Sequence, residues 1–262
     1  MEGGEWGLLN QAGKPSDRLK AASEVAKLIE DHKGLFEASR PQKQDVWLLY
    51  SENSWALGTI EGNGYDVNNP RNVQMAADAL CGAYLMCSDL GLNVGIIDEK
   101  RLVEEGLPQD ALLIVPGATS LELRTCEKIS QLIEEGAKVI ADGLFAMKDR
   151  NGCIALENKK VVSSIFGAEL EDITADMGDI HLALGDRSEK INGWFFKCSF
   201  AGVETENILG RFENGEAGCI MNHYGKGQAI YIGTTFFQRY LPKPETQNLG
   251  FIKALLPEAE KK

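Results

Sequence analysis

Polar and aromatic side chains with recognisable chemistry follow the ends of two apolar segments. Glu52, Asn53 and Trp55 come directly after the uncharged segment Val46–Tyr50, and Asp142 ends a second apolar segment. Carboxylates and amides hydrogen-bond ligands, and tryptophan anchors a ligand or a protein surface. Ligands of open α/β sheets bind beyond the carboxyl ends of the strands. We therefore expect a site here, provided that both segments are strands.

Each of these groups also has a structural interpretation. Trp55 either anchors another surface or covers its own helix, and Asp142 before a glycine is also typical of a turn with a capping carboxylate. The segment Ser51–Tyr65 combines large apolar side chains with glycines, so we expect a loop that makes contacts there. The candidate interface or ligand contacts are Glu52, Asn53, Trp55, Tyr65 and Asp142.

The chemistry that such a fold often carries is missing from the sequence. A nucleophile in an α/β protein sits on a tight turn from a strand to a helix, beside a base. The two candidate turns, Val115–Ser120 and Ala141–Phe145, hold no cysteine or serine between flanking glycines. We expect Thr119 or Ser120 to cap the next helix and Cys126 to pack inside it. The histidines lack metal-ligand spacing and no glycine-rich phosphate loop is present, so we predict no catalytic residue, no cofactor and no metal.

Composition and charge narrow the class of protein. The 262 residues are 44% apolar and 25% charged with a net charge of −12, and the pI is about 4.8. Nucleic acids and anionic membranes attract clustered lysine and arginine, so we expect neither as a partner. No apolar segment reaches the ~20 residues that cross a bilayer. Met1–Glu5 shows neither the basic nor the apolar region of a secretory signal, so we expect none in this sequence. The six cysteines lack CxxC spacing. We expect them to be reduced core residues, and the protein to be cytoplasmic.

The elements that must position these residues alternate in the first part of the chain. A helix beginning at Ser16 or Asp17 carries apolar residues at helical spacing as far as Phe36, and a polar linker follows it. Four apolar segments are then typical of buried strands, with helical patterns between them, one of which starts at Asn69–Pro70. The strands are Val46–Tyr50, Asn93–Asp98, Ala111–Val115 and Lys138–Ala141. This order predicts an α/β fold with a flavodoxin-like parallel sheet.

Beyond residue 150 the pattern becomes one of short strands, with an Asn-Gly hairpin signal at Glu213–Glu216. Val161–Phe166 reads as a short helical or extended link, and Thr246–Leu256 as a closing amphipathic helix. These strands could form a separate sandwich or extend the edge of the α/β sheet, and we favour a β-rich C-terminal elaboration packed on the α/β core. Its predicted strands are Ile180–Leu184, Ile191–Phe200, Ile208–Phe212, Ala217–Asn222 and Gln228–Ile232.

Several of these segments resemble a known family, the trimerisation domain of bacterial β-galactosidases of glycoside hydrolase family 42. The segments that carry the resemblance are Val46–Leu57, Asp89–Val94, Ala111–Pro116, Leu132–Ile140, Arg211–Gly215 and Tyr224–Tyr231. The resemblance implies a class I glutamine-amidotransferase-like fold without the glutaminase chemistry. The N-terminal piece, with Gly7-Leu8-Leu9 and Gly13-Lys14-Pro15, is similar to the closing segment of the catalytic barrel in such enzymes.

The resemblance implies a division into residues 1–44, as the end of a barrel with its helix, and residues 45–262, as the trimerisation domain. A (β/α)₈ barrel needs ~250 residues, so we expect a fragment of a longer protein and carry no catalytic glutamate onto the sequence. The implied function is a non-catalytic oligomerisation and support domain of a β-galactosidase-like glycoside hydrolase in carbohydrate metabolism. Its partners would be the catalytic barrel of the same protein and further copies, as a trimer.

Two alternatives from other classes use the same loops at the strand ends. One is an amidotransferase-like enzyme or small-ligand binder acting near Glu52, Asn53 and Asp142. The other is a sugar-binding module, for which Trp47, Trp55 and Trp194 would supply aromatic faces.

Overall fold

The structure, a computed structural model, describes residues 7–10, 12–39, 42–61, 75–184 and 187–256. The chain divides into two compact units, Met1–Lys43 and Gln44–Lys262. Tyr65 and the predicted helix start at Asn69–Pro70 lie outside the described residues.

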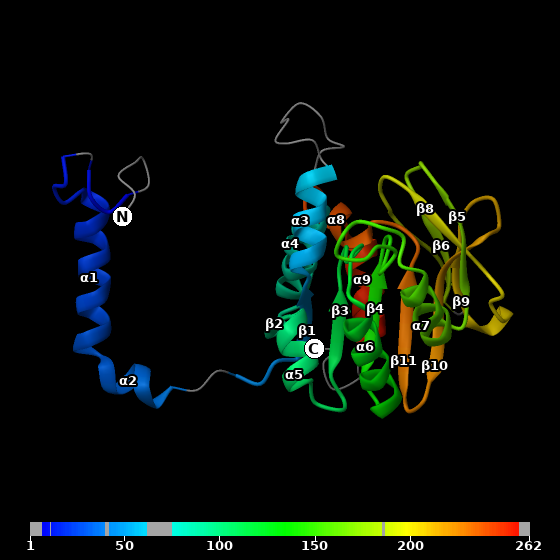
Figure 1. The fold of residues 1–262 in the computed structure, drawn as a ribbon, viewed down its shortest axis with the longest axis horizontal. Helices are drawn as coiled ribbons and strands as arrows, with labels where there is room; N and C mark the ends of the chain where they lie inside the picture. Colours follow the sequence, from blue (N-terminus) through cyan, green and yellow to red (C-terminus); the bar gives the residue numbers. More distant parts are fainter. Residues whose placement is uncertain (1–6, 11, 40–41, 62–74, 185–186, 257–262) are drawn as a thin grey trace. The chain divides into compact units, whose positions relative to one another are not determined.

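The first unit consists of two helices, α1 (Asp17–Asp31) and α2 (Lys33–Ala38) (Figure 1). The hydroxyl of Ser16 accepts a hydrogen bond from the Leu19 amide at 3.4 Å and caps α1, as predicted. The predicted single helix as far as Phe36 is wrong, because the chain bends at His32 between the two helices. Neither helix has a buried residue.

The second unit is built on a parallel sheet with helices on both faces, as predicted (Figure 1). The strands are β1 (Val46–Tyr50), β2 (Val94–Asp98), β3 (Leu112–Val115) and β4 (Lys138–Asp142). They lie in the order β2-β1-β3-β4, and β11 (Gly227–Ile232) pairs in parallel with β4. The helices in this part are α3 (Glu52–Glu61), α4 (Met75–Asp89), α5 (Glu99–Glu105) and α6 (Leu123–Glu135).

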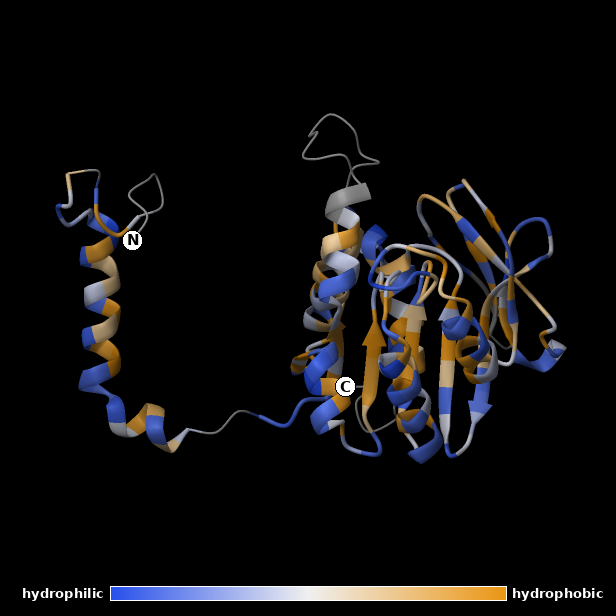
Figure 2. Cartoon of the chain, in the orientation of Figure 1, coloured by the Kyte–Doolittle hydropathy of each residue, from blue (hydrophilic) through white to orange (hydrophobic). Residues whose placement is uncertain are grey.

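Two hydrophobic clusters cover the two faces of this sheet. Alternate residues of a strand point to opposite faces, so Leu49 packs in the cluster that contains α6, and Leu48 packs in the cluster that contains α4. The central strand β3 is hydrophobic along its length (Figure 2). All four of its residues are buried. A continuous apolar strand is what a sheet covered on both faces requires.

The β-rich elaboration extends the same sheet past β11. Its strands are β5 (Glu169–Thr174), β6 (Ile180–Leu184), β7 (Arg187–Ile191), β8 (Lys197–Ala201), β9 (Ile208–Arg211) and β10 (Ala217–Tyr224). The order β11-β10-β9-β6-β7 is antiparallel, while β8 pairs with β10 and with β5. The remaining helices are α7 (Leu156–Phe166), α8 (Phe236–Tyr240) and α9 (Thr246–Leu255).

Two sequence predictions about element type are wrong. Ser51–Tyr65 is not a loop in its described part, because the Ser51 hydroxyl accepts the Ser54 amide and starts α3. Ile191–Phe200 is not one strand. β7 ends at Ile191, and Phe195 has a φ of +63°, which no extended strand contains.

Candidate functional site

The loops that follow β1, β2 and β3 meet in a buried polar network. Ser51 Oγ lies 2.7 Å from Glu99 Oε1, and Thr125 Oγ1 donates to Glu99 Oε2 at 3.0 Å. Ser54 Oγ donates to the Ser120 carbonyl at 2.8 Å and accepts from the Ser120 amide at 2.9 Å. Burial raises the pKa of Glu99, and its hydrogen bonds with Ser51 and Thr125 partly offset this. Both oxygens of Glu99 are therefore engaged within the network.

Asp142 lies at the carboxyl end of β4 and is fully buried. Its Oδ1 accepts the Gly117 amide at 2.7 Å, and its Oδ2 accepts the Phe237 amide at 2.9 Å. Burial raises the pKa of Asp142 to about 7, although these hydrogen bonds favour the carboxylate. This geometry agrees with the capping interpretation, since Asp142 ties the turn after β3 to the start of α8.

The turn after β3 is where this architecture would hold a nucleophile. Gly117 occupies the left-handed conformation there, with a φ of +58°. A Cβ at this position would lie 2.7 Å from the Cβ of Ala79 on α4. The turn therefore has no room for a reactive side chain. The predicted capping of α6 by Thr119 or Ser120 is wrong, because Glu122 is the residue at the N-terminus of that helix.

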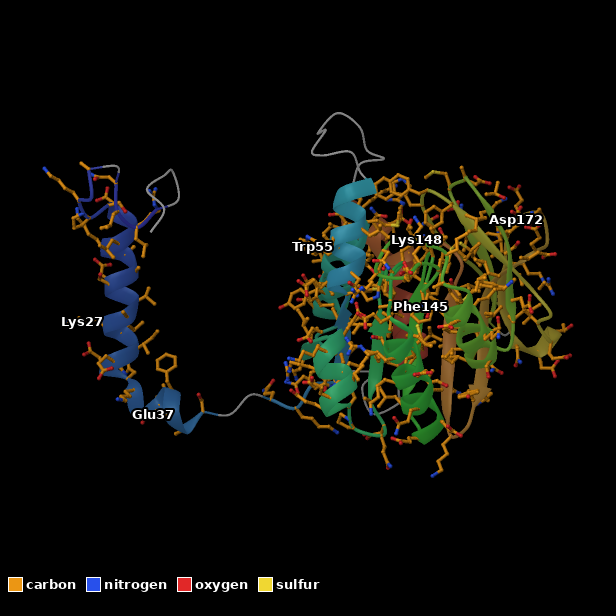
Figure 3. All side chains as sticks on the ribbon, viewed as in Figure 1. Lys27, Glu37, Trp55, Phe145, Lys148 and Asp172 are labelled. Atoms are coloured by element: carbon orange, nitrogen blue, oxygen red, sulfur yellow. The ribbon has the colours of Figure 1, made fainter. Side chains whose placement is uncertain are left out.

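The predicted contact residues that the structure describes lie on α3 rather than on a loop. Glu52 is exposed in the first turn, and Asn53 is half-buried with its amide 3.5 Å from Glu99 Oε1. Trp55 is 38% exposed, and its ring meets the Tyr50 ring edge-on at 5.9 Å. Figure 3 shows Trp55 on α3, with Asp172 of β5 on the far side of the same unit. Trp55 and Asn53 are thus close in the chain to the buried network, whereas Asp142 is internal.

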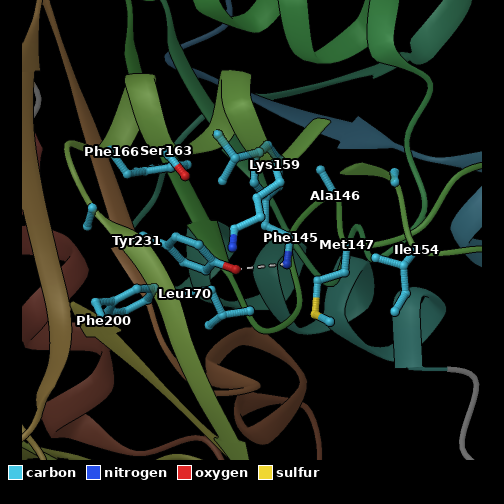
Figure 4. A pocket seen from close by; sticks show the side chains of 13 residues that line it. Phe145, Ala146, Met147, Ile154, Lys159, Ser163, Phe166, Leu170, Phe200 and Tyr231 are labelled. Atoms are coloured by element: carbon cyan, nitrogen blue, oxygen red, sulfur yellow. Dashed lines mark hydrogen bonds between the residues drawn. The ribbon is translucent and has the colours of Figure 1, made fainter. Parts of the chain in front are cut away.

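An apolar cavity of about 200 Å³ lies between α7 and strands β5, β8 and β11 (Figure 4). The Tyr231 hydroxyl, on its wall, donates to the Gly143 carbonyl at 3.0 Å and accepts the Phe145 amide at 3.1 Å. Lys159 pairs with Glu169 at 3.6 Å. The lining suits an apolar group. Ile154, which also lines the cavity, is largely exposed.

The cysteines do not form a reactive site. Four of the six free cysteines are buried, but Cys81 and Cys153 are exposed, so the expectation that all six lie in the core is wrong. Burial raises the pKa of the Cys126 thiol to about 12, which disfavours the nucleophilic thiolate. No group of metal-ligating side chains is found among the described residues. No helix in this part of the chain is long and apolar enough to cross a membrane.

Sequence reasoning missed the centre of the polar network, although a usable signal was present. Glu99 directly follows β2, and Ser51 directly follows β1, so the rule that selected Glu52 also applies to them. Thr125 could not be found in this way, because its position depends on how α6 packs against α5.

The strand order is that of a flavodoxin-like α/β domain. Its turn after β3, where Ala79 of α4 leaves no room for a side chain at Gly117, carries no nucleophile. Residues 44–259 match the family model described as the β-galactosidase trimerisation domain. The chain therefore belongs to the family of β-galactosidase trimerisation domains. No curated protein matches the chain.

Solved structures share this fold. A catalytic mutant of a GH42 β-galactosidase from G. stearothermophilus matches with a TM-score of 0.66 and 19% identity, over 95% of this chain and 34% of that chain. A β-galactosidase from Bacillus circulans sp. alkalophilus matches with a TM-score of 0.63 and 14% identity, over 94% and 36%. A ThuA-like protein from Bacteroides uniformis matches with a TM-score of 0.52 and 12% identity, over 83% and 93%. The chain spans about a third of the length of these two β-galactosidase chains. These identities show the fold alone.

Proposed function

We propose that the chain is a non-catalytic oligomerisation and support domain of a β-galactosidase-like glycoside hydrolase. Its partners are further copies of itself, as a trimer, and the catalytic barrel of the same protein. The observation that carries the proposal is the set of large apolar side chains that each unit, taken by itself, leaves exposed among its described residues. A surface of this kind is typical of protein–protein contact.

The first of these surfaces is the apolar face of α1 and α2, formed by Val25, Leu28, Ile29 and Phe36. Residues three and four apart lie on one face of a helix, so Val25, Leu28 and Ile29 make a continuous stripe. A helix of 15 residues is marginal in water without tertiary packing. Burying each such side chain would contribute roughly 1.5–3 kcal/mol. We propose that this stripe packs on the catalytic barrel.

The second surface is on the Gln44–Lys262 unit and centres on Trp55. An exposed tryptophan held edge-on against Tyr50 offers a large, pre-ordered contact area. We propose that it anchors the contact between copies. Ile154 and Leu156, which are 72% and 70% exposed, provide another apolar contact beside the cavity of Figure 4.

Three features support the absence of catalysis in this chain. The turn after β3 is closed by α4 at Gly117, and the Cys126 thiol has a raised pKa. The half-buried carboxylate of Glu99 and the buried carboxylate of Asp142 are both held by internal hydrogen bonds. A retaining glycosidase needs an acid and a nucleophile facing the substrate ~5–5.5 Å apart. Such a pair belongs to the proposed barrel partner.

The test compares two truncations of equally exposed side chains, Trp55→Ala at 38% and Ile173→Ala at 39% on β5. Sedimentation equilibrium of each variant would measure self-association. We expect Trp55→Ala to weaken each contact between copies about 30-fold, from the loss of ~2 kcal/mol at an interface anchor, while Ile173→Ala leaves self-association unchanged. A lower melting temperature for Trp55→Ala with unchanged association would make Trp55 a packing residue and reject this interface.

A further inference from the structure

The apolar cavity of Figure 4 is too large to be a packing defect. Its volume is about 200 Å³. A single buried water needs roughly 10–15 Å³, and protein interiors leave few voids larger than that. Apolar cavities of about 150 Å³ are known to hold a benzene ring. The cavity therefore has room for a ligand of one ring or of two fused rings.

One side of the cavity is a continuous face of α7. Lys159, Val162, Ser163 and Phe166 line the cavity at helical spacing, three and four residues apart. Val161, next to Val162 in the sequence, instead lines a groove between α6 and α7. Neighbouring valines on one helix therefore belong to different surfaces, and only Val162 faces the cavity.

The rest of the wall centres on the ring of Tyr231. Its centroid lies 4.7 Å from that of Phe200 and 4.8 Å from that of Phe166, with the ring planes tilted by 53° and 47°. Phe145 meets Tyr231 and Phe166 edge-on, at 6.1 and 5.7 Å. Aromatic pairs in such orientations attract one another beyond the area that they bury. A further ring in the cavity can make the same contacts, so the lining favours an aromatic ligand over a saturated one.

The polar groups of the lining favour a ligand without charge. Among the described residues, the polar side chains belong to Tyr231, Lys159 and Ser163. The Tyr231 hydroxyl already donates one hydrogen bond and accepts another, both with backbone groups of the turn after β4. The ammonium of Lys159 repels a cation, and Glu169, 3.6 Å from it, balances its charge towards an anion. Because burying an unpaired charge is costly, the cavity suits a neutral molecule.

The cavity opens beside Ile154, on the turn between β4 and α7. The Ile154 side chain lines the cavity and is nevertheless 72% exposed. The turn that carries it is held by Asp149, whose Oδ1 accepts the amides of Asn151 and Cys153 at 2.8 and 2.9 Å. A ligand at this mouth would cover an apolar side chain that otherwise faces water, which favours binding.

We infer that this cavity binds a neutral aromatic molecule of one ring or two fused rings, which enters past Ile154 and packs its ring against Tyr231 and Phe166. The inference goes beyond the proposed function, since association between copies does not require a ligand. The competing occupant is a side chain of a second copy, which would make occupation of the cavity and self-association depend on each other.

Calorimetry and saturation-transfer NMR on the full chain would test the cavity with benzyl alcohol and indole. The titrations use a protein concentration at which the chain is monomeric, so that no second copy covers Ile154. We expect dissociation constants of about 0.1–1 mM, the affinity usual for ligands of this size. Cyclohexylmethanol, without an aromatic ring, and the benzylammonium cation should each bind weaker than benzyl alcohol by about tenfold or more. Failure of both aromatic ligands up to about 10 mM, or equal binding of either comparison compound, would overturn the inference.

The neighbouring valines of α7 locate the binding. Val162→Phe places a ring inside the cavity and should abolish binding of benzyl alcohol, whereas Val161→Phe is the matched control and should bind as the parent does. Ala155→Leu, at another lining residue, is a second blocking variant if Val162→Phe does not fold. Undiminished binding by a folded blocking variant, or loss of binding in a folded Val161→Phe, would reject the cavity as the site.

Sedimentation equilibrium separates this inference from the proposed function. Saturating benzyl alcohol and the Val162→Phe variant should both leave self-association unchanged. If both instead weaken it, the cavity holds a side chain of another copy and the inference is wrong, while the proposed function stands. A chain that binds the ring but never associates would contradict the proposed function alone.

Discussion

Asp142 is the residue at which charge and folding are most directly coupled. Its carboxylate is fully buried, and burial raises its pKa from 3.8 to about 7. An acid whose folded pKa lies above its unfolded pKa binds its proton more tightly in the folded state. Its contribution to stability is therefore complete below pH 4 and is lost as the pH rises towards 7.

The first prediction follows from the upward direction of this pKa shift. Relative to Asp142→Asn, the parent chain should lose stability progressively between pH 4 and 7 and change little above pH 8. The shift corresponds to a loss of about 4 kcal/mol. Urea unfolding of both proteins across this range measures the difference. A difference that is constant with pH would show that the pKa of Asp142 is the same in the folded and unfolded protein, which would contradict the shift that burial causes.

The sequence located Asp142 at a strand end but not in the interior. Its burial depends on α8, whose five residues after Thr235 gave no helical periodicity to read. Trp55 is a second residue whose burial could not be predicted from the sequence. Its type and position could be read from the sequence, whereas its exposure depends on how α3 lies against β1.

Among the elements, the turn after β3 is constrained by both conformation and space. Gly117 and Gly143 both have positive φ, of +58° and +64°. A Cβ on Gly117 would collide with Ala79, whereas a Cβ on Gly143 has its nearest contact at 3.8 Å, with Thr235 Cγ2. Comparing alanine substitutions at Gly117 and Gly143 therefore distinguishes the cost of backbone strain from the cost of a steric collision.

The second prediction is that Gly143→Ala costs about 1 kcal/mol of unfolding free energy, from the left-handed conformation alone. Gly117→Ala should cost about 1–3 kcal/mol more, because α4 must move. Chemical denaturation would measure both. Equal costs would show that α4 does not close this turn.

The third prediction concerns the buried sheet. Ile114→Asp places an unpaired charge in a fully buried strand and should abolish the cooperative melt, at a cost of more than ~4 kcal/mol. Ile96→Asp, at an exposed position of the edge strand β2, is the matched control and should keep the melt. A folded Ile114→Asp protein would mean that β3 is not at the centre of the core.

The long apolar strands could be predicted because burial on both faces leaves a continuous pattern, as in Leu112–Val115. The short helix Glu99–Glu105 could not, since its seven residues are mostly charged and only Leu102 is buried. Strand β5 was missed for the related reason that its residues, Glu169–Thr174, are mostly exposed. The structure of α5 and β5 depends on the elements that they pack against, which are distant in the sequence.

At the scale of the whole molecule, we propose that the catalytic chemistry lies outside this chain. The fourth prediction is that the purified chain hydrolyses no aryl-galactoside and releases no ammonia from glutamine. Chromogenic and ammonia-release assays would test it. The account would be wrong if turnover survived purification and disappeared on substitution of Cys126, Asp142 or Glu52.

The most direct test of the central claim is the mass of the full chain in solution, measured by sedimentation equilibrium over increasing protein concentration. The proposed function predicts a monomer that converts to a trimer as the concentration rises. The Trp55→Ala variant should require on the order of 100-fold more protein for the same conversion, because ~2 kcal/mol is lost at each of three contacts and the midpoint concentration varies as the square root of the overall dissociation constant. A parent chain that stays monomeric throughout, or that stops at a dimer, would contradict the claim that this domain holds the oligomer together.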